Sequence, residues 1–312
     1  MINVNGLSKS YGDFKAVNDI SFMIRGGEIT GLLGPNGAGK TTTLRMLSCY
    51  LSPDSGSITV DDKDSRDNAL EIKAMIGYLP ESAPLYSDMM VYDYLKYVAE
   101  LRGITGEERI DDVAGICRIT DVMHKNIGEL SKGYKQRVGL AHAMIHDPEI
   151  LILDEPTSGL DPIEIVEIRN LIRDLGKKKT VILSTHILSE VEATCDRVII
   201  INRGKIVADD STENLQSAVR GDKNIVLRVS GTDFDGLQSA LAGISGIKHI
   251  AGIDGDEFTS ASIDVSPGSE VRPDIFKTAV EKNWIIFEMK QEHLSLENIF
   301  RELTTGGANG KA

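Results

Sequence analysis

Residues 34–41 have the residue types and the spacing of a phosphate-binding loop. They read Gly-Pro-Asn-Gly-Ala-Gly-Lys-Thr and fit the pattern G-x-x-x-x-G-K-[ST]. The apolar run 29–33 before the loop predicts a buried strand, and the residues 42–47 after it predict a helix. A chance glycine-rich turn followed by a lysine is the alternative, and it does not explain this strand–loop–helix context.

The loop predicts a cradle for the phosphates of ATP. Glycines permit positive φ and close backbone approach, and the N-terminus of the following helix adds partial positive charge. Lys40 is expected to reach the β- and γ-phosphates, and the Thr41 hydroxyl is expected to ligate Mg²⁺. The residues expected to hold the nucleotide here are Gly34, Pro35, Asn36, Gly37, Ala38, Gly39, Lys40, Thr41 and Thr42.

Two carboxylates end a second apolar run. Asp154 and Glu155 follow residues 150–153, which read Ile-Leu-Ile-Leu and are typical of a strand buried on both faces of a parallel sheet. Such sheets bind ligands at the carboxyl ends of their strands. Asp154 is expected to support Mg²⁺, and Glu155 to polarise the attacking water, a role worth about 10²–10⁴-fold in rate. A solvated acidic strand end is the alternative.

A third segment, 130–137, reads Leu-Ser-Lys-Gly-Tyr-Lys-Gln-Arg, and with it the chain resembles the ATP-binding subunits of ABC transporters over about residues 2–215. The segment is similar to the family signature. The resemblance implies that Ser131 and Gly133 contact the γ-phosphate bound by a partner subunit. Tyr11 stands where the family places an aromatic side chain that stacks on adenine, although ordinary packing also explains a lone tyrosine.

Two further loops carry the resemblance. Residues 158–161 are similar to the family's dimer-contacting loop, and residues 184–186 to its switch-histidine loop. His186 follows the apolar run 181–183, and the resemblance implies that it senses the γ-phosphate and steadies the developing charge. The residues expected to act in catalysis are Lys40, Glu155 and His186.

The sequence departs from the family pattern at three positions. Glu81 stands where the family usually has glutamine, and it is expected to approach Mg²⁺ or to accept from a metal-bound water. Lys132 replaces the first glycine of the signature, and Tyr134 replaces its glutamine. This variant resembles exporters of the ABC-2 class, including the gliding-motility and the multidrug or polysaccharide branches.

The resemblance implies an α/β fold, the P-loop ABC ATPase cassette, with a mixed sheet, an antiparallel edge and a helical lobe. It implies an ATP-hydrolysing motor subunit that closes as a dimer, most simply a homodimer, and drives a separate integral membrane permease. The expected location is cytoplasmic, on the inner face of the cell membrane. The alternatives are a non-transport ABC ATPase that acts on ribosomes or DNA, and one that signals through a membrane subunit.

The composition and net charge of the chain argue against several classes of protein. The chain has 312 residues, 41% of them hydrophobic, and a formal net charge of −13, which argues against nucleic-acid binding and against direct attraction to anionic lipid. No apolar run approaches the ~18 residues of a membrane span. The first residues lack the charged region and the apolar stretch of a signal peptide, so none is expected. Cys49, Cys117 and Cys195 are expected to be reduced packing residues.

The sequence predicts two domains and a tail. Residues 1–218 form the nucleotide-binding domain, 222–304 an α+β accessory domain, and 305–312 a flexible tail. In the accessory domain the order β-α-β-β-α-β, followed by a short helix at 296–303, predicts a ferredoxin-like fold.

Three local features complete the predictions. Asp161-Pro162 is expected to begin a helix whose buried face holds Ile168, Leu171, Ile172 and Leu175. Residues 197–206 predict a hairpin. His142 and His146 are expected four apart on one helix, where a structural role is favoured over a metal site because no third ligand is evident.

Overall fold

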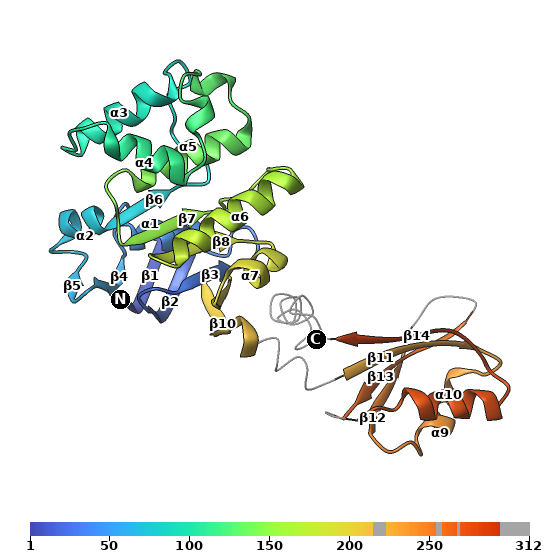
Figure 1. Ribbon diagram of the computed structural model, residues 1–312. Helices are drawn as coiled ribbons and strands as arrows, with labels where there is room; N and C mark the ends of the chain where they lie inside the picture. The colour runs from blue at the N-terminus through green and yellow to red at the C-terminus, as the bar shows by residue number, and fades with distance from the viewer. Residues whose placement is uncertain (215–222, 254–257, 267–268, 294–312) are drawn as a thin grey trace. The chain divides into compact units, whose positions relative to one another are not determined.

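A six-stranded sheet lies at the centre of the first part of the chain (Figure 1). Its spatial order is β10-β9-β3-β8-β7-β6, and every neighbouring pair is parallel except β9 and β10. All residues of β3, β7 and β8 are buried, which confirms that these apolar runs are strands covered on both faces. The strands are β3 (Ile29–Leu33), β6 (Ile76–Leu79), β7 (Ile150–Asp154), β8 (Thr180–Thr185), β9 (Arg197–Asn202) and β10 (Lys205–Ser211).

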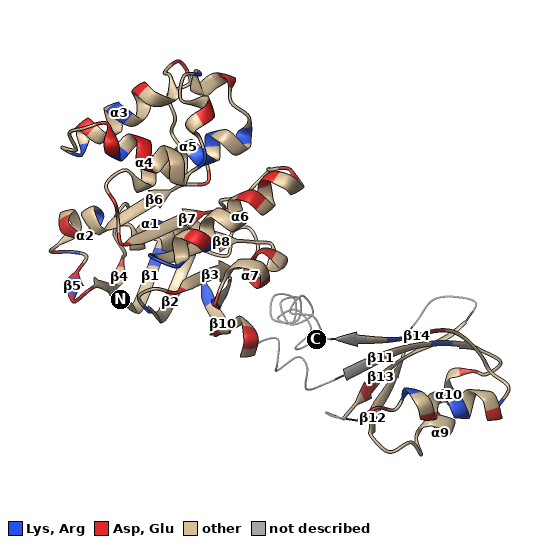
Figure 2. Cartoon of the chain, in the orientation of Figure 1, with Lys and Arg blue, Asp and Glu red and all other residues tan. Residues whose placement is uncertain are grey.

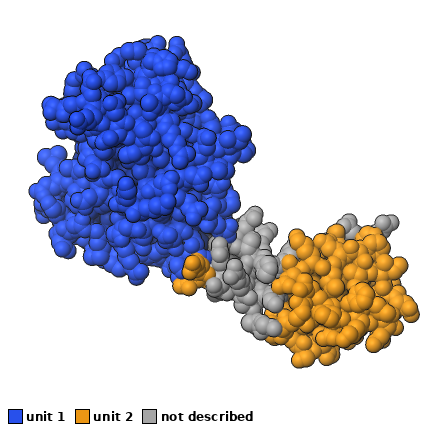
Figure 3. Space-filling view, viewed as in Figure 1, with its two compact units in different colours: residues 1–212 blue, residues 213–312 orange. Residues whose placement is uncertain are grey.

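The computed structural model describes residues 1–214, 223–253, 258–266 and 269–293. It divides into two units, Met1–Thr212 and Glu213–Ala312 (Figure 3). The predicted boundary between 218 and 222, the predicted helix 296–303 and the predicted tail 305–312 lie outside the described residues.

The antiparallel strands near the N-terminus form a sheet of their own, in the order β2-β1-β4-β5. The antiparallel edge of the central sheet is instead β10, because the predicted hairpin 197–206 returns along β9. Helix α1 (Lys40–Leu47) contributes Leu44 and Leu47 to the core shared with both sheets, which includes Ile58 and Ile152. The second sheet comprises β1 (Ile2–Tyr11), β2 (Phe14–Ile24), β4 (Ser55–Val60) and β5 (Lys63–Asp64).

The predicted helical lobe is present between β6 and β7. Its helices α3 (Val91–Leu101), α4 (Glu108–Ile116) and α5 (Lys132–Met144) pack against one another, and α5 also packs on β6 (Figure 1). Acidic and basic residues are interspersed along α3, α4 and α6 (Figure 2). Helices of this unit outside the lobe include α2 (Ala69–Met75), α6 (Pro162–Gly176) and α7 (Leu188–Thr194).

Helix α6 begins as predicted. The Asp161 carboxylate accepts hydrogen bonds from the backbone N–H groups of Ile163 and Glu164, both at 2.9 Å, and Pro162 occupies the first turn. The four predicted apolar positions, Ile168, Leu171, Ile172 and Leu175, are all buried.

The second unit has the predicted ferredoxin-like topology. Its sheet order is β12-β13-β11-β14, with all pairs antiparallel, and two helices cross between strands. A core of its own includes Leu227, Leu237, Ile263 and Ile275. The elements are β11 (Lys223–Ser230), α9 (Phe234–Leu241), β12 (Ile247–Gly252), β13 (Thr259–Val265), α10 (Arg272–Glu281) and β14 (Ile285–His293).

The three cysteines, Cys49, Cys117 and Cys195, form no disulfide bond. Burial raises the pKa of the Cys117 thiol to about 12, as suits a packing residue.

Across residues 1–214, 223–253, 258–266 and 269–293, no helix is both long enough and apolar enough to cross a bilayer.

The expectation that both histidines lie on one helix is wrong, because α5 ends at Met144 and only His142 is helical. His142 Nδ1 lies 2.6 Å from the Tyr94 hydroxyl, and His146 Nε2 lies 3.1 Å from the Ile76 carbonyl oxygen. The described residues contain no group of three ligands able to hold a metal ion. The His142 ring therefore links two helices of the lobe, α5 and α3. The His146 ring links the segment after α5 to the backbone of β6.

His146 gives the fold a pH dependence. Burial, with a smaller contribution from Arg102, lowers the pKa of His146 from 6.5 to about 4. Below pH 6.5 the unfolded chain therefore takes up a proton at this ring that the folded chain does not. The free energy of unfolding should fall as the pH falls from about 6.5 to 4, and His146→Gln should flatten that slope. Urea unfolding at several pH values measures it, with pH 8 as the reference where the ring is neutral in both states. An unchanged slope in the variant would contradict the assignment.

Candidate active site

Strand order brings three distant loops together. In the central sheet β8 lies between β3 and β7, with Leu33 opposite Thr185 and Asp154 opposite Ser184. Because these strands are parallel, their carboxyl ends meet at one edge, where open α/β sheets bind ligands. The phosphate-binding loop, the acidic pair and the histidine loop meet there. Strand β6, next to β7, brings in the loop that holds Glu81.

The loop after β3 requires glycine at two positions for different reasons. A Cβ at Gly34 would collide with the carbonyl oxygen of Ile201, so this position allows close backbone approach. Gly39 precedes α1 with φ +109°, in the left-handed region that favours glycine. The first turn of α1 contains no acidic residue. The helix N-terminus thus presents uncompensated N–H groups, which fits an anion such as a phosphate.

Lys40 is held at the mouth of this loop. Its ammonium donates to the carbonyl oxygen of Gly34 at 2.7 Å and to that of Pro35 at 3.3 Å, and it lies 3.2 Å from Glu155 Oε1. The side chain is only 6% exposed. A buried ammonium pairs with the nearest available anion, and Glu155 is its partner here.

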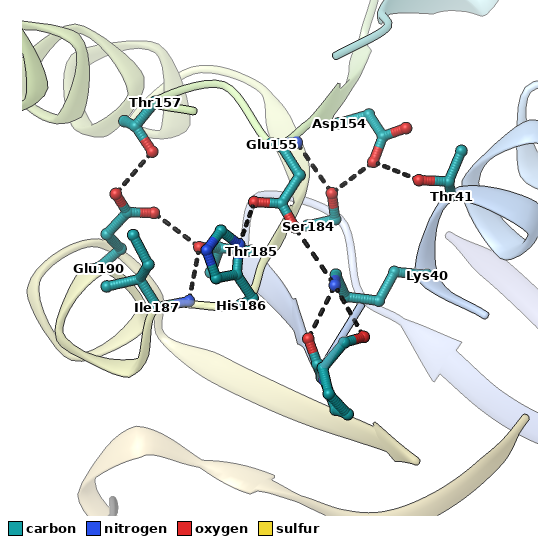
Figure 4. A network of polar contacts seen from close by, with 12 residues as sticks. Lys40, Thr41, Asp154, Glu155, Thr157, Ser184, Thr185, His186, Ile187 and Glu190 are labelled. Carbon is teal, nitrogen blue, oxygen red and sulfur yellow. Dashed lines mark hydrogen bonds and ion pairs between the residues drawn. The ribbon is translucent and has the colours of Figure 1, made fainter. Parts of the chain in front are cut away.

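Ser184 links the Asp154 carboxylate to the backbone of Glu155 (Figure 4). Its hydroxyl donates to Asp154 Oδ1 at 2.6 Å and accepts from the backbone N–H of Glu155 at 2.9 Å. The Thr41 hydroxyl donates to the same Asp154 oxygen at 3.1 Å. Asp154 is thereby fixed between α1 and β8. Ser184 belongs to the loop 184–186 that the sequence singled out, but its bond to Asp154 was not predicted, because its register opposite Asp154 depends on the pairing of two strands.

Glu155 adopts an unusual backbone conformation that points its side chain across the site. Its φ is +47°, a region that costs a non-glycine residue of order ~1–3 kcal/mol and is found mainly at functional sites. Its Oε2 lies 2.9 Å from His186 Nδ1. An ionised carboxylate only accepts, so the contact assigns a proton to Nδ1. Glu155 therefore joins Lys40 to His186.

A pocket opens in front of this cluster. It is lined by the loop residues 36–42, by Glu155 and His186, and by Glu81 from the β6 side. Tyr11 and Phe14, at the turn between β1 and β2, are 49% and 59% exposed and line it as well. Sequence reasoning missed Phe14 and Ala16, because only the folded hairpin brings them to the loop, whereas Ser158 in the same lining belongs to the predicted loop 158–161.

The signature segment lies outside this pocket. Ser131 caps α5: its hydroxyl accepts from the Tyr134 N–H at 3.3 Å and donates to Glu164 Oε1 at 3.1 Å. A Cβ at Gly133 would overlap the same Glu164 carboxylate. The glycine therefore allows an acidic side chain of α6 to lie against the N-terminus of α5. Sequence reasoning missed Glu164, since its partners are about thirty residues away.

The two altered signature positions have structural partners. The Tyr134 hydroxyl donates to Asp121 Oδ2 at 2.7 Å, and the Arg137 guanidinium stacks 5.6 Å from the centre of its ring. The Lys132 ammonium occupies the space that a side chain at Gly159 would need. Both replacements therefore make contacts within the same chain, Tyr134 inside the lobe and Lys132 toward the loop 158–161.

Comparison with known protein families adds to this geometry. The family model described as "ABC transporter" matches residues 17–158. A second model, "AAA domain, putative AbiEii toxin, Type IV TA system", matches the shorter stretch 126–192.

Three similar proteins cover different parts of the chain. The bacitracin transport ATP-binding protein BcrA of Bacillus licheniformis is 40% identical over 70% of this chain and 72% of its own. The linearmycin resistance ATP-binding protein LnrL of Bacillus subtilis (strain 168) is 32% identical over 97% of this chain and 98% of its own, so the similarity includes the second unit. The structure of cbiO1 from Clostridium perfringens, part of the ABC transporter complex cbiONQ, superimposes with a TM-score of 0.64 at 30% identity, over 70% of this chain and 92% of its own. With the phosphate-binding loop, the acidic strand end and the histidine loop in one site, the chain belongs to the ATP-binding subunits of ABC transporters, and it is an ATPase of that family.

Proposed function

We propose that this chain is the ATP-hydrolysing motor subunit of an ABC-2-type exporter, which works as a homodimer with a separate integral membrane permease. The observation that carries the proposal is the contact of Glu155 with both Lys40 and His186 at the edge of the nucleotide pocket. These three groups can bind a terminal phosphate, accept a proton from water and stabilise the charge that develops.

The residues act as follows in this proposal. Lys40 transfers its ammonium from Glu155 to the β- and γ-phosphates, which releases the carboxylate to take a proton from the attacking water. His186 donates its Nδ1–H to Glu155, and when the ring is protonated at both nitrogens it donates its Nε2–H to the γ-phosphate. The reaction joins water to the γ-phosphorus and breaks the bond to the β–γ bridging oxygen, giving ADP and phosphate.

Mg²⁺ fits the donor set beside the phosphates. The Thr41 hydroxyl and the carboxylates of Asp154 and Glu81 are the hard oxygen ligands that this ion prefers, and few protein ligands suffice because phosphates and water complete its shell. When bound, the ion neutralises charge on the β- and γ-phosphate oxygens. Glu81, in place of the family's glutamine, adds a negative charge on this side of the pocket.

Ser131 and Gly133 support the dimer. They lie on the lobe and do not line the pocket of their own chain, so within one subunit they have no nucleotide to contact. Placed across a two-fold axis, the N-terminus of α5 offers a hydroxyl and N–H groups to the γ-phosphate of the partner. Two nucleotides are then buried between two subunits.

The relatives and a groove support export through a permease. The names of BcrA and LnrL refer to bacitracin transport and to linearmycin resistance. A groove beside the loop 80–84 is lined by Tyr50, Tyr78, Tyr94 and Arg45. This groove fits an amphipathic helix from a membrane subunit. Docking of that helix would hold the chain at the inner face of the membrane.

Removing the aromatic side chains at the pocket rim tests adenine stacking. Tyr11→Ala should weaken ATP binding by about tenfold, since stacking on a base is worth about 1–3 kcal/mol, and Tyr11→Phe should not. Titration with a fluorescent ATP analogue measures this, and the affinity for inorganic triphosphate should stay constant. A loss in Phe14→Ala with none in Tyr11→Ala would assign the stacking to Phe14 instead.

Removing the proposed base tests the dimer. Glu155→Gln should lower turnover by about 10²–10⁴-fold and should accumulate a dimer with Mg-ATP but not with Mg-ADP. Light scattering after size-exclusion chromatography reports the mass. The matched control adds Lys40→Ala, which should abolish the dimer by removing nucleotide binding. A Glu155→Gln variant that binds ATP yet stays monomeric would refute the dimer.

Recovery of the partner tests the export role. Full-length chain isolated from membranes should bring down a protein with about six apolar segments of ~20 residues. Tyr50→Asp, in the groove, should abolish recovery and leave ATP binding intact, whereas Leu70→Asp, an exposed position on α2, should change neither. Recovery with ribosomes or DNA instead would favour a non-transport ATPase.

A further inference from the structure

We infer that Glu190 is a positioning residue for ATP hydrolysis, because its buried carboxylate ties the loop that carries Glu155 to the loop that carries His186. The inference rests on the roles proposed above for those two residues. Glu190 lies in the first turn of α7, after the histidine loop, and does not line the nucleotide pocket.

Both oxygens of this carboxylate are used (Figure 4). Oε1 accepts from the Thr157 hydroxyl at 2.6 Å, and Oε2 accepts from the Thr185 hydroxyl at 2.7 Å. Thr157 stands two residues after Glu155, and Thr185 directly precedes His186. One side chain therefore holds a residue adjacent to each reacting loop.

The contacts close a ring around the two loops. Thr185 Oγ1 also accepts from the Ile187 N–H at 3.0 Å, so the hydroxyl fixes the backbone on both sides of His186. The Glu155 carbonyl accepts from the Ser158 N–H at 3.0 Å, so Thr157 sits inside a tight turn. The contact between His186 Nδ1 and Glu155 Oε2 completes the ring. A displacement of either loop must break one of these bonds.

A carboxylate matches the two hydroxyl donors that face it. Glu190 is 5% exposed, and within the described residues no cation forms an ion pair with it. Its desolvation is therefore offset by the two hydroxyl donors. A carboxylate accepts at both oxygens, whereas the amide of glutamine accepts at one end and donates at the other. Glu190→Gln keeps the shape but can accept from only one of the two hydroxyls, so the other threonine must turn its hydroxyl to accept from the amide N–H.

Loop position matters because the reacting groups lie at contact distance. A displacement of about 1 Å in a catalytic group typically costs about 10²-fold in rate. The nucleotide itself is held by α1 and its loop, which Glu190 does not touch. The effect should consequently fall on turnover rather than on binding.

Steady-state kinetics of the full chain test the inference. Glu190→Gln should lower kcat by about 10–100-fold while KM for ATP and the affinity for a fluorescent ATP analogue change less than about threefold. The matched control is Glu192→Gln, an exposed position on the same helix, which should leave all three unchanged. If Glu190→Gln behaves like Glu192→Gln, or if it loses nucleotide binding and thermal stability together with kcat, the positioning role is wrong.

A mutant cycle identifies the route. Thr157→Val and Thr185→Val should each lower kcat, and in the Glu190→Gln background their effects should be smaller than alone. Full additivity would overturn the shared carboxylate. The proposed function fails separately: Glu155→Gln or His186→Ala with normal kcat would refute the catalytic roles. Reduced kcat in those two variants with normal kcat in Glu190→Gln would refute this inference alone.

Discussion

The alignment of β7, β8 and β3 is the constraint on which the site depends. Each strand ends at the same edge, and the register places Asp154 opposite Ser184 and Leu33 opposite Thr185. A shift of one residue would turn every side chain to the opposite face of its strand. The hydroxyl of Ser184 would then no longer reach both Asp154 and the backbone of Glu155. The apolar packing of these strands fixes their register, and the register fixes the positions of the polar groups at the strand ends.

Each charged side chain at this edge of the sheet has a partner within the protein, and some of these partners can be exchanged for a bound nucleotide. Lys40 contacts two carbonyl oxygens and Glu155, and Glu155 contacts His186. A nucleotide can replace these contacts with stronger ones, since a polyphosphate carries more charge than one carboxylate. The deeper groups, Asp154 and Glu190, are tied to hydroxyls and stay in place. The site therefore combines fixed and exchangeable carboxylates.

The signature segment shows why position in the fold decides the role of a motif. Ser131 and Gly133 form a helix start that suits an anion, and in this chain the anion against it is the Glu164 carboxylate. Lys132 and Tyr134, which depart from the family pattern, contact the loop 158–161 and Asp121 respectively. Tyr134 thus makes its contact within the lobe, and Lys132 makes its contact with the loop that precedes α6.

Features set by neighbouring residues were predictable. The strand–loop–helix around residues 34–41, the cap at Asp161, the buried face of α6 and the β-α-β-β-α-β order of the second unit follow from local pattern, and the structure confirms them. The position of His146 was predicted wrongly, because α5 ends at Met144 and the chain then turns through Asp147, whose φ is +54°, before Pro148. Phe14, Glu164 and Glu190 were not predicted at all, and the bond of Ser184 to Asp154 was not predicted either.

The reason is the range of the interactions. A glycine before a helix, a proline in its first turn or an apolar run states its preference within a few residues, so the sequence by itself determined the family, the nucleotide loop and the residues that carry charge to the strand ends. Hydrogen bonds such as Thr157 to Glu190 and Thr185 to Glu190 join residues whose proximity exists only after β7 and β8 pair. Only the tertiary structure decided how those charged residues are held, because pairing between distant strands sets distances that no local pattern encodes.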